Sequence, residues 1–289
     1  MSALPDIQAF FDPATNTVSY VVSDPRTREC AVIDSVLDYD PKAGRTASRS
    51  AERIVEYVRQ GGLETRWILE THAHADHLSA AQYLKRTLGG TVGVGEHIKE
   101  VQRLFAAVFN FEPDFAPDGS QFDRLFRDGD TFKVGEITGR IMHTPGHTPA
   151  CVTYLIGDAA FVGDTLFMPD YGTARTDFPG GDARTLYRSI QRILALPPQT
   201  RLFMCHDYGA PGRAEFAWES TVEDERRANV HVKPGTDEDA FVLMRTHRDA
   251  GLQMPTLILP SVQVNIRAGD LPPPESNGVR YLKIPIDAL

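Results

Sequence analysis

Three histidines and a carboxylate lie within the seven residues from Thr71 to His77, which read Thr-His-Ala-His-Ala-Asp-His. The cluster directly follows the apolar run 67–69, which is typical of a strand. Imidazole binds Zn and Fe, and carboxylate binds harder cations, so this mixture of side chains indicates a metal site. A solvated polar loop has no need of three histidines at this spacing.

Four residues on one loop cannot complete a metal site, so further ligands are expected downstream. His147, Asp164 and His206 are the candidates, and each follows or interrupts a β-like apolar run. Taken alone, each has another interpretation: a single histidine is usually a packed residue, and Asp in a Gly-Asp-Thr turn bonds its own backbone. Cys205 adjoins His206 but is expected to point away from it, because neighbouring strand residues face opposite sides.

Composition limits the class of protein. The 289 residues are 42% hydrophobic and 24% charged, which suits one large domain, or one domain plus an appendage. A net charge of −9 argues against a nucleic-acid partner. Neither a signal peptide nor a membrane segment is expected, because the chain has no long apolar run. Three scattered cysteines favour a reducing compartment and a cytoplasmic location.

Short β and α patterns alternate along the chain, without repeats. Strands are expected at 17–22, 30–34, 66–70, 91–94, 131–134, 137–142, 152–156, 159–162 and 201–204, and helices at 48–60, 78–88 and 98–109. Asp182 is expected to cap a further helix that ends before Pro197. The division expected is a catalytic domain at 1–229 and a Pro-rich C-terminal extension packed on it at 230–289, with a helix at 238–249 and a strand-like run at 257–266.

Phenylalanines gather between Phe105 and Phe126, among Asp, Pro and Gly residues. This region is expected to cover or line the site. The alternative is an ordinary helix and loop packed on the core.

The order of the motifs resembles that of the metallo-β-lactamase superfamily. Its ligand motifs correspond to His-x-His-x-Asp-His at 72–77, the Thr-Pro-Gly-His-Thr run ending at Thr148, Gly-Asp-Thr at 163–165 and a late His206. The resemblance covers about residues 17–208. It implies an α+β fold, the αββα metallo-β-lactamase sandwich with a short C-terminal extension, but the superfamily does not fix the reaction.

Other segments are similar to the glutathione-handling branch that holds hydroxyacylglutathione hydrolases and persulfide dioxygenases. Residues 175–178 resemble the Arg-Thr-Asp-Phe motif of the dioxygenases, where the hydrolases usually carry an Arg-Phe-Phe-Glu type sequence. The tail after Leu259 also looks like that of a bacterial branch of the dioxygenases. The resemblance therefore implies an oxidoreductase of sulfide detoxification that uses glutathione persulfide and O2 and forms glutathione and sulfite.

In these dioxygenases one Fe(II) per chain is held by two histidines and one carboxylate, which leaves positions open for persulfide and O2. The equivalents here are His72, His147 and Asp164. Four other residues would then not bind the metal but would orient its ligands and water: His74, Asp76, His77 and His206.

The alternative is a hydroxyacylglutathione (thioester) hydrolase with two Zn or Fe/Mn ions. One ion would then be held by His72, His74 and His147, the other by Asp76, His77 and His206, with Asp164 between them. A hydroxide between the ions would attack the thioester.

Glutathione is anionic, so a net-acidic protein needs a local cation to bind it. Arg175 is the first candidate, with Thr148 and Tyr208 as hydrogen-bonding neighbours taken from the family pattern. Arg175 could instead pair with Asp177 or Asp170 and hold its loop, and Tyr208 could be packed surface. The family also suggests a homodimer.

Overall fold

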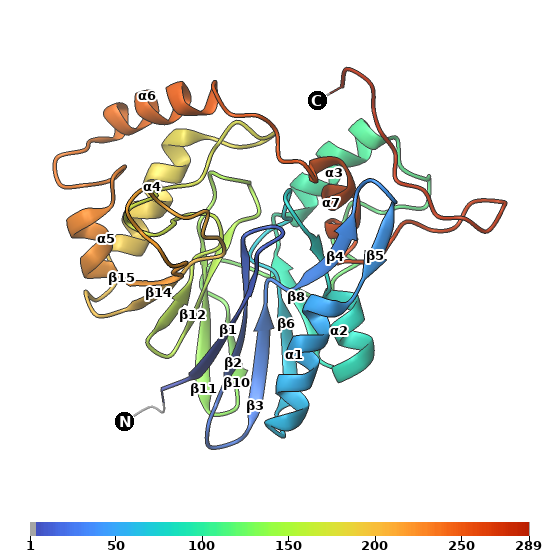
Figure 1. Ribbon diagram of the computed structural model, residues 1–289, viewed down its shortest axis with the longest axis horizontal. Coiled ribbons are helices and arrows are strands. Elements are labelled where there is room, and N and C mark those ends of the chain that lie inside the picture. Colours follow the sequence, from blue (N-terminus) through green and yellow to red (C-terminus); the bar gives the residue numbers. More distant parts are fainter. Residues whose placement is uncertain (1–3, 289) are drawn as a thin grey trace.

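Strand β2 (Thr17–Ser23) is buried along its whole length, and its side chains alternate between two hydrophobic layers. Tyr20 and Val22 belong to one layer and Val21 to the other. A strand that is apolar on both faces must be covered on both. The computed structural model, which describes residues 4–288, meets this need with two face-to-face sheets and helices on both outer sides (Figure 1).

The first sheet carries helices on its outer face. Its strands are, in spatial order, β1 (Asp6–Asp12), β2, β3 (Glu29–Ile33), β6 (Glu64–Leu69), β8 (Thr91–Gly95) and β9 (Arg124–Phe126). Helices α1 (Arg49–Gln60), α2 (Ala81–Leu88) and α3 (Ile98–Phe109) bury Ile54, Leu84 and Phe105 in the layer to which Val21 belongs. The last four strands run parallel, so their carboxyl ends share one edge.

The second sheet faces the first across Tyr20, Tyr154 and Phe161. Its strands are, in spatial order, β10 (Thr131–Val134), β11 (Ile137–His143), β12 (Val152–Ile156), β13 (Ala159–Phe161), β14 (Arg201–Phe203) and β15 (Glu219–Thr221). Helices α4 (Ala183–Leu194) and α5 (Val222–Ala228) pack on its outer face. The predicted cap of α4 is confirmed, because Asp182 Oδ1 accepts a hydrogen bond from Thr185 N at 2.7 Å.

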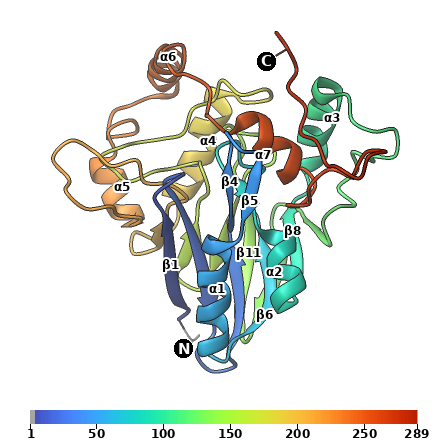
Figure 2. The same ribbon diagram turned by 45° about the vertical axis from the view of Figure 1, so that its right-hand side comes forward.

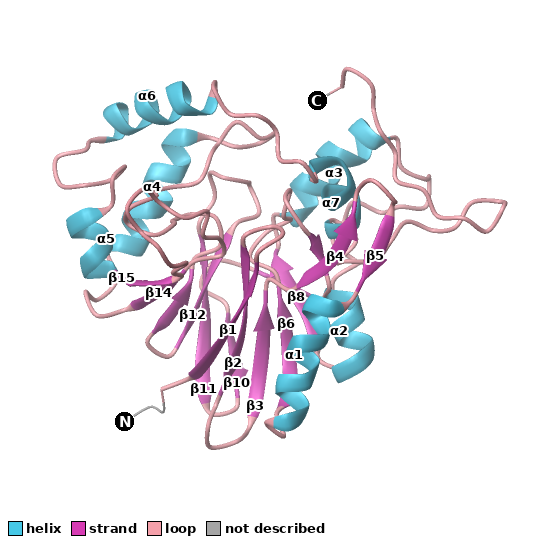
Figure 3. Cartoon of the chain, viewed as in Figure 1, coloured by secondary structure: helices cyan, strands magenta, loops and turns pink. Residues whose placement is uncertain are grey.

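The described part of the C-terminal segment, residues 230–288, contacts both halves of the sandwich. Helix α6 (Glu238–Asp249) packs on α4, and α7 (Ile258–Asn265) lies beside α3 (Figure 2). Helix α7 also contacts a small sheet of β5 (Arg45–Ala47), β4 (Val36–Asp40) and β7 (Leu78–Ser79). After α7 the described chain continues to residue 288 without helix or strand (Figure 3). The division at residue 229 stays a prediction.

The expected αββα sandwich is confirmed, but three local predictions are wrong. The strand-like run at 257–266 is helix α7, because a short apolar run does not distinguish a buried helix from a strand. The helix expected at 78–88 begins only at Ala81, because Leu78 and Ser79 pair with β4. The phenylalanine-rich region packs on the core and does not line the cavity beside the candidate ligands Asp76, His147 and Asp164. No helix among the described residues is long and apolar enough to span a membrane.

Glu225 on α5 gives the fold a pH-dependent stability. Its side chain is fully buried, and this burial raises its pKa from 4.5 to about 8. Between these values the folded protein keeps a proton that the unfolded chain releases, so the free energy of unfolding falls as pH rises, by about 1.4 kcal/mol per pH unit for this group. Urea denaturation at pH 5.5, 7 and 8.5 should show this slope in the wild type, whereas Glu225→Gln should lack it. Equal slopes in the two proteins would contradict the assignment.

Candidate metal centre

The sequence-predicted ligands meet at one edge of the sandwich, on loops that follow strands. Residues 71–77 follow β6, and His147 lies in the loop between β11 and β12. Asp164 follows β13 and His206 follows β14. Strands β13 and β14 are parallel neighbours, so their carboxyl ends deliver Asp164 and His206 to the same place.

Two glycines allow these loops to approach closely. Gly163, beside Asp164, has φ of +53°, and a Cβ there would lie 2.7 Å from Thr71 Oγ1. Gly146, beside His147, has φ of +133°, and a Cβ would lie 2.3 Å from the backbone nitrogen of Leu186. Both positions therefore require glycine.

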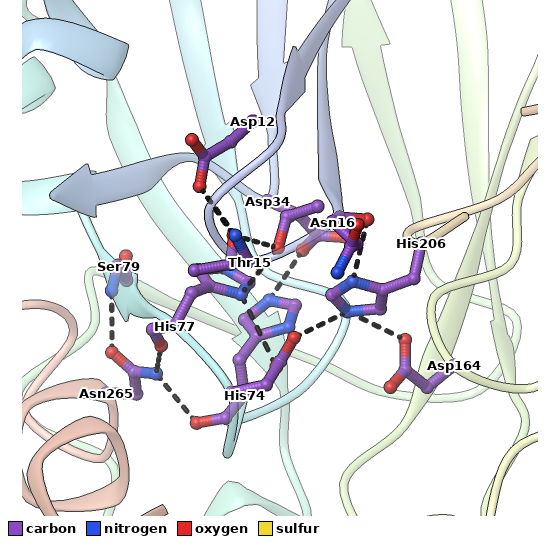
Figure 4. A network of polar contacts seen from close by, with 12 residues as sticks. Asp12, Thr15, Asn16, Asp34, His74, His77, Ser79, Asp164, His206 and Asn265 are labelled. Atoms are coloured by element: carbon purple, nitrogen blue, oxygen red, sulfur yellow. Dashed lines mark hydrogen bonds and ion pairs between the residues drawn. The ribbon is translucent and has the colours of Figure 1, made fainter. Parts of the chain in front are cut away.

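Two groups of potential ligands meet at Asp164, which belongs to the first group and lies beside the second. In the first group, Asp164 Oδ2 lies 3.9 Å from His72 Nε2 and 3.6 Å from His147 Nε2. In the second, His206 Nε2 lies 3.2 Å from Asp76 Oδ2 and 3.3 Å from Asp164 Oδ1 (Figure 4). The second group also contains His74 and His77. The two carboxylate oxygens of Asp164 thus face different groups.

Backbone carbonyls set the tautomers of two histidines. His147 Nδ1 lies 2.8 Å from Arg175 O, and His206 Nδ1 lies 3.3 Å from Asn16 O. A carbonyl only accepts, so each Nδ1 donates its proton, and in the neutral ring Nε2 then carries a lone pair. These lone pairs face carboxylate oxygens, an arrangement that is repulsive unless a cation lies between them.

A chain of hydroxyl groups sets the tautomer of His77 (Figure 4). Thr15 Oγ1 donates to Asp12 Oδ2 at 2.7 Å and lies 2.8 Å from Thr17 Oγ1. Thr17 therefore donates to Thr15 and is free to accept from His77 Nδ1, at 3.2 Å. The Nε2 of His77 is left for a ligand.

Asp34 orients the remaining two histidines. It accepts the hydroxyl proton of Thr71 at 2.9 Å, so Thr71 Oγ1 can accept from His72 Nδ1 at 3.0 Å. His74 is turned the other way, with Nε2 3.1 Å from Asp34 Oδ1 and 3.2 Å from Glu70 Oε2. Its Nδ1 is the atom that remains for a ligand.

The donor set fits a metal ion. Six buried nitrogen and oxygen atoms of the two groups have no hydrogen-bond partner among the described residues: His72 Nε2, His74 Nδ1, Asp76 Oδ2, His77 Nε2, Asp164 Oδ1 and His206 Nε2. Buried atoms of this kind are normally paired, so a group of six facing one another indicates a cation.

The pKa values of His72 and His77 are consistent with a bound metal ion. Burial lowers the pKa of His72 well below its usual value, and it also lowers the pKa of His77, so both rings are held in the neutral form that metals require. Burial also disfavours charge on His74, but Asp34 and Glu70 outweigh it and raise the pKa of His74. A metal at His74 would therefore displace a proton.

A cavity of ≈ 600 Å³ opens onto the metal centre. Asp76, His147 and Asp164 are among its lining residues. Of the three predicted substrate-binding residues, Arg175 and Tyr208 line it, and the ring of Tyr208 stacks on His206 at 5.5 Å between centroids. Thr148 is not among the described residues lining the cavity.

Thr148 is buried, and its Oγ1 lies 3.1 Å from Cys151 Sγ and accepts a hydrogen bond from Ala150 N. Its side chain therefore bonds within the turn that contains it. Arg175 is already engaged, because it makes two 2.6 Å hydrogen bonds to the carboxylate of Asp177 and a third to the carbonyl of Gln253. This pairing is the alternative that the sequence left open for Arg175. A role of Arg175 and Thr148 in binding substrate stays a prediction.

The sequence did not single out Arg245 and Arg248, which α6 brings to the cavity wall. Arg245 is buried and bonded to Asp249, whereas Arg248 is exposed and makes no ion pair with any described residue. Arg248 is thus the cation of the cavity that is available to an anionic ligand. The spacing of three residues on a predicted helix, which places both arginines on one face, was the signal that could have found them.

The expectation that Cys205 points away from the site is wrong. Cys205, His206 and Asp164 each bring one potential ligand atom within 4.8 Å of the others. Cys205 and His206 both follow the end of β14, where the alternation of side chains along a strand no longer applies. Burial raises the pKa of the Cys205 thiol well above its usual value.

The fold has known counterparts. The structure is similar to the crystal structure of ETHE1 from Myxococcus xanthus, with a TM-score of 0.73 and 28% sequence identity over 92% of this chain and 100% of that chain. The chain is 32% identical to the mitochondrial persulfide dioxygenase ETHE1 of Homo sapiens, over 91% of this chain and 88% of that protein.

Relatives with higher identity carry other names. A probable metallo-hydrolase of Burkholderia pseudomallei is 61% identical over 98% of this chain and 99% of its own length. A beta-lactamase hydrolase-like protein of Xylella fastidiosa is 55% identical over 99% of this chain, which spans 65% of that protein. Residues 12–206 match the family described as the metallo-beta-lactamase superfamily, and the chain belongs to that superfamily.

Proposed function

We propose that this protein is a persulfide dioxygenase with one Fe(II) per chain. The observation that carries the proposal is the first ligand group, in which His72, His147 and Asp164 present two imidazoles and one carboxylate to one point. Two histidines and one carboxylate are typical of non-haem Fe(II) oxygenases, because they leave coordination positions for both substrates. The similarity to the human persulfide dioxygenase supports the same assignment.

The proposed reaction converts glutathione persulfide, O2 and water into glutathione and sulfite. Bound Fe(II) would activate O2 and supply the positions where the two substrates meet, while the electrons that reduce O2 come from the persulfide sulfur. Asp76 and His206 lie beside this point and are suited to hold water by hydrogen bonds. Phe178 packs edge-on against His147, with 5.2 Å between ring centroids, and keeps bulk water from that side.

The cavity suits a substrate of the size and charge of a glutathione derivative. Arg248 supplies a cation that no described residue pairs with at the cavity wall, and Tyr208 supplies a hydroxyl beside the metal centre. Persulfide sulfur is soft and suits iron, while the peptide portion with its carboxylates would lie toward Arg248.

The alternative function is a binuclear thioester hydrolase. One observation favours it: all residues of the second group are retained, and Asp164 directs one oxygen to each group, as a bridging ligand would. The metallo-hydrolase name of the Burkholderia relative points the same way. The metal and the reaction distinguish the two functions.

The test is to produce the full chain with iron and zinc both available and to measure metal content and activity together. We expect about one iron per chain and O2 consumption that depends on glutathione persulfide and forms sulfite. Two metal ions per chain, with hydrolysis of a glutathione thioester and no O2 uptake, would replace the dioxygenase by the hydrolase. The predicted homodimer and cytoplasmic location are separate and stay predictions.

A further inference from the structure

Asn265, the last residue of α7, reaches the metal-binding loop from a segment almost two hundred residues away in sequence (Figure 4). Its Nδ2 donates to His74 O at 2.8 Å and to His77 O at 2.7 Å. Its Oδ1 accepts from Ser79 N at 2.7 Å. The side chain is 4% exposed, so water cannot replace these bonds.

These three bonds engage both N–H donors and the oxygen of the carboxamide, and they fix its orientation. Two carbonyls face Nδ2 and one N–H faces Oδ1, so the opposite orientation would place an oxygen against two acceptors. Between the two anchored carbonyls lie the backbone atoms that carry Asp76 and His77. The carboxamide therefore fixes the distance and orientation of the loop that presents potential ligands to the centre.

The end of α7 is itself held in place. Gln102 Nε2 donates to Ile266 O at 2.8 Å, and Arg267 pairs with Glu112 at 2.6 Å. Gly269 packs so closely that a Cβ would lie 2.8 Å from Ser79 O. Asn265 thus projects from a rigid support, as a group that positions ligands must.

We propose that Asn265 is a positioning residue of the metal centre, by which the C-terminal segment sets the metal affinity of the loop at 72–77. The inference rests on the metal-binding part of the proposed function and holds for either reaction. Outer groups of this kind orient ligands and typically change metal affinity by ~10–100-fold when removed.

Gln263 provides a matched control on the same helix. It is also a buried carboxamide with three backbone contacts: Nε2 donates to Leu259 O and Lys283 O, and Oε1 accepts from Lys283 N. These contacts hold the C-terminal tail and not the metal loop. Gln263→Leu and Asn265→Leu therefore remove similar bonds from similar surroundings.

The experiment measures the affinity of the metal-free full chain for Zn²⁺ by competition with a chelator, together with the thermal stability of the metal-free proteins. We expect both variants to lose stability to a similar degree. Only Asn265→Leu should bind Zn²⁺ ~10–100-fold more weakly. Asn265→Asp, which keeps the acceptor for Ser79 N and loses the donors, should show a similar loss and serves if Asn265→Leu does not fold.

Equal Zn²⁺ affinity of the wild type and a folded Asn265 variant would overturn the proposal. So would failure of both Asn265 variants to fold while Gln263→Leu folds, because Asn265 would then serve the fold in general. A wild type that binds metal but consumes no O2 with persulfide would refute the dioxygenase and leave the role of Asn265 intact.

Discussion

His72→Ala, His147→Ala and Asp164→Ala should each abolish iron binding. Each change removes one of the three ligands proposed for the iron, and the two that remain would not hold the ion. Asp164→Ala should in addition disturb the second group, because its two oxygens face both ligand groups. Iron content after desalting, compared with the wild type, measures the effect.

His206→Ala is the matched control for these variants, because His206 is equally buried and belongs to the second group. It should keep its iron and lose activity by ~10–100-fold, as changes outside the metal ligands usually do. If His206→Ala instead removes half of the metal from a two-metal preparation, the centre is binuclear and the hydrolase is favoured.

The sequence predicted that the candidate ligands meet in one place because they follow strands directly. A strand fixes where its end lies, so His72, Asp164 and His206 could be placed at one edge before the sheet order was known. The cap of α4 was predictable for a similar reason, since Asp182 acts on the backbone three residues ahead.

The errors concern contacts between segments distant in sequence. Residues 258–265 have an apolar pattern that suits a strand or a helix, and only packing beside α3 and β7 decides for the helix. The anchoring of the metal loop by Asn265 depends on that same packing and therefore had no local signal. Arg248 was missed because its helical spacing with Arg245 places both arginines on one face of α6 but does not show that this face reaches the cavity.

Replacing Arg248 with Ala should raise KM for glutathione persulfide by roughly 10- to 100-fold. A charge-assisted hydrogen bond to a substrate carboxylate contributes ~1.5–3 kcal/mol, and none of residues 4–288 forms an ion pair with Arg248 that would compete for it. The kcat at saturating substrate and the iron content should not change, because a contact made equally in the ground and transition states alters KM alone. Arg248→Lys should restore part of the loss.

Arg175→Ala tests the sequence-based candidate in the same assay. Arg175 is bonded to Asp177 and Gln253, and its own carbonyl accepts from His147 Nδ1. If it holds the cavity wall, its loss should lower stability or kcat more than it raises KM. A large rise in KM for Arg175→Ala with a normal KM for Arg248→Ala would show that the substrate carboxylate binds Arg175 and not Arg248. Normal KM values in both variants would show that neither arginine binds it.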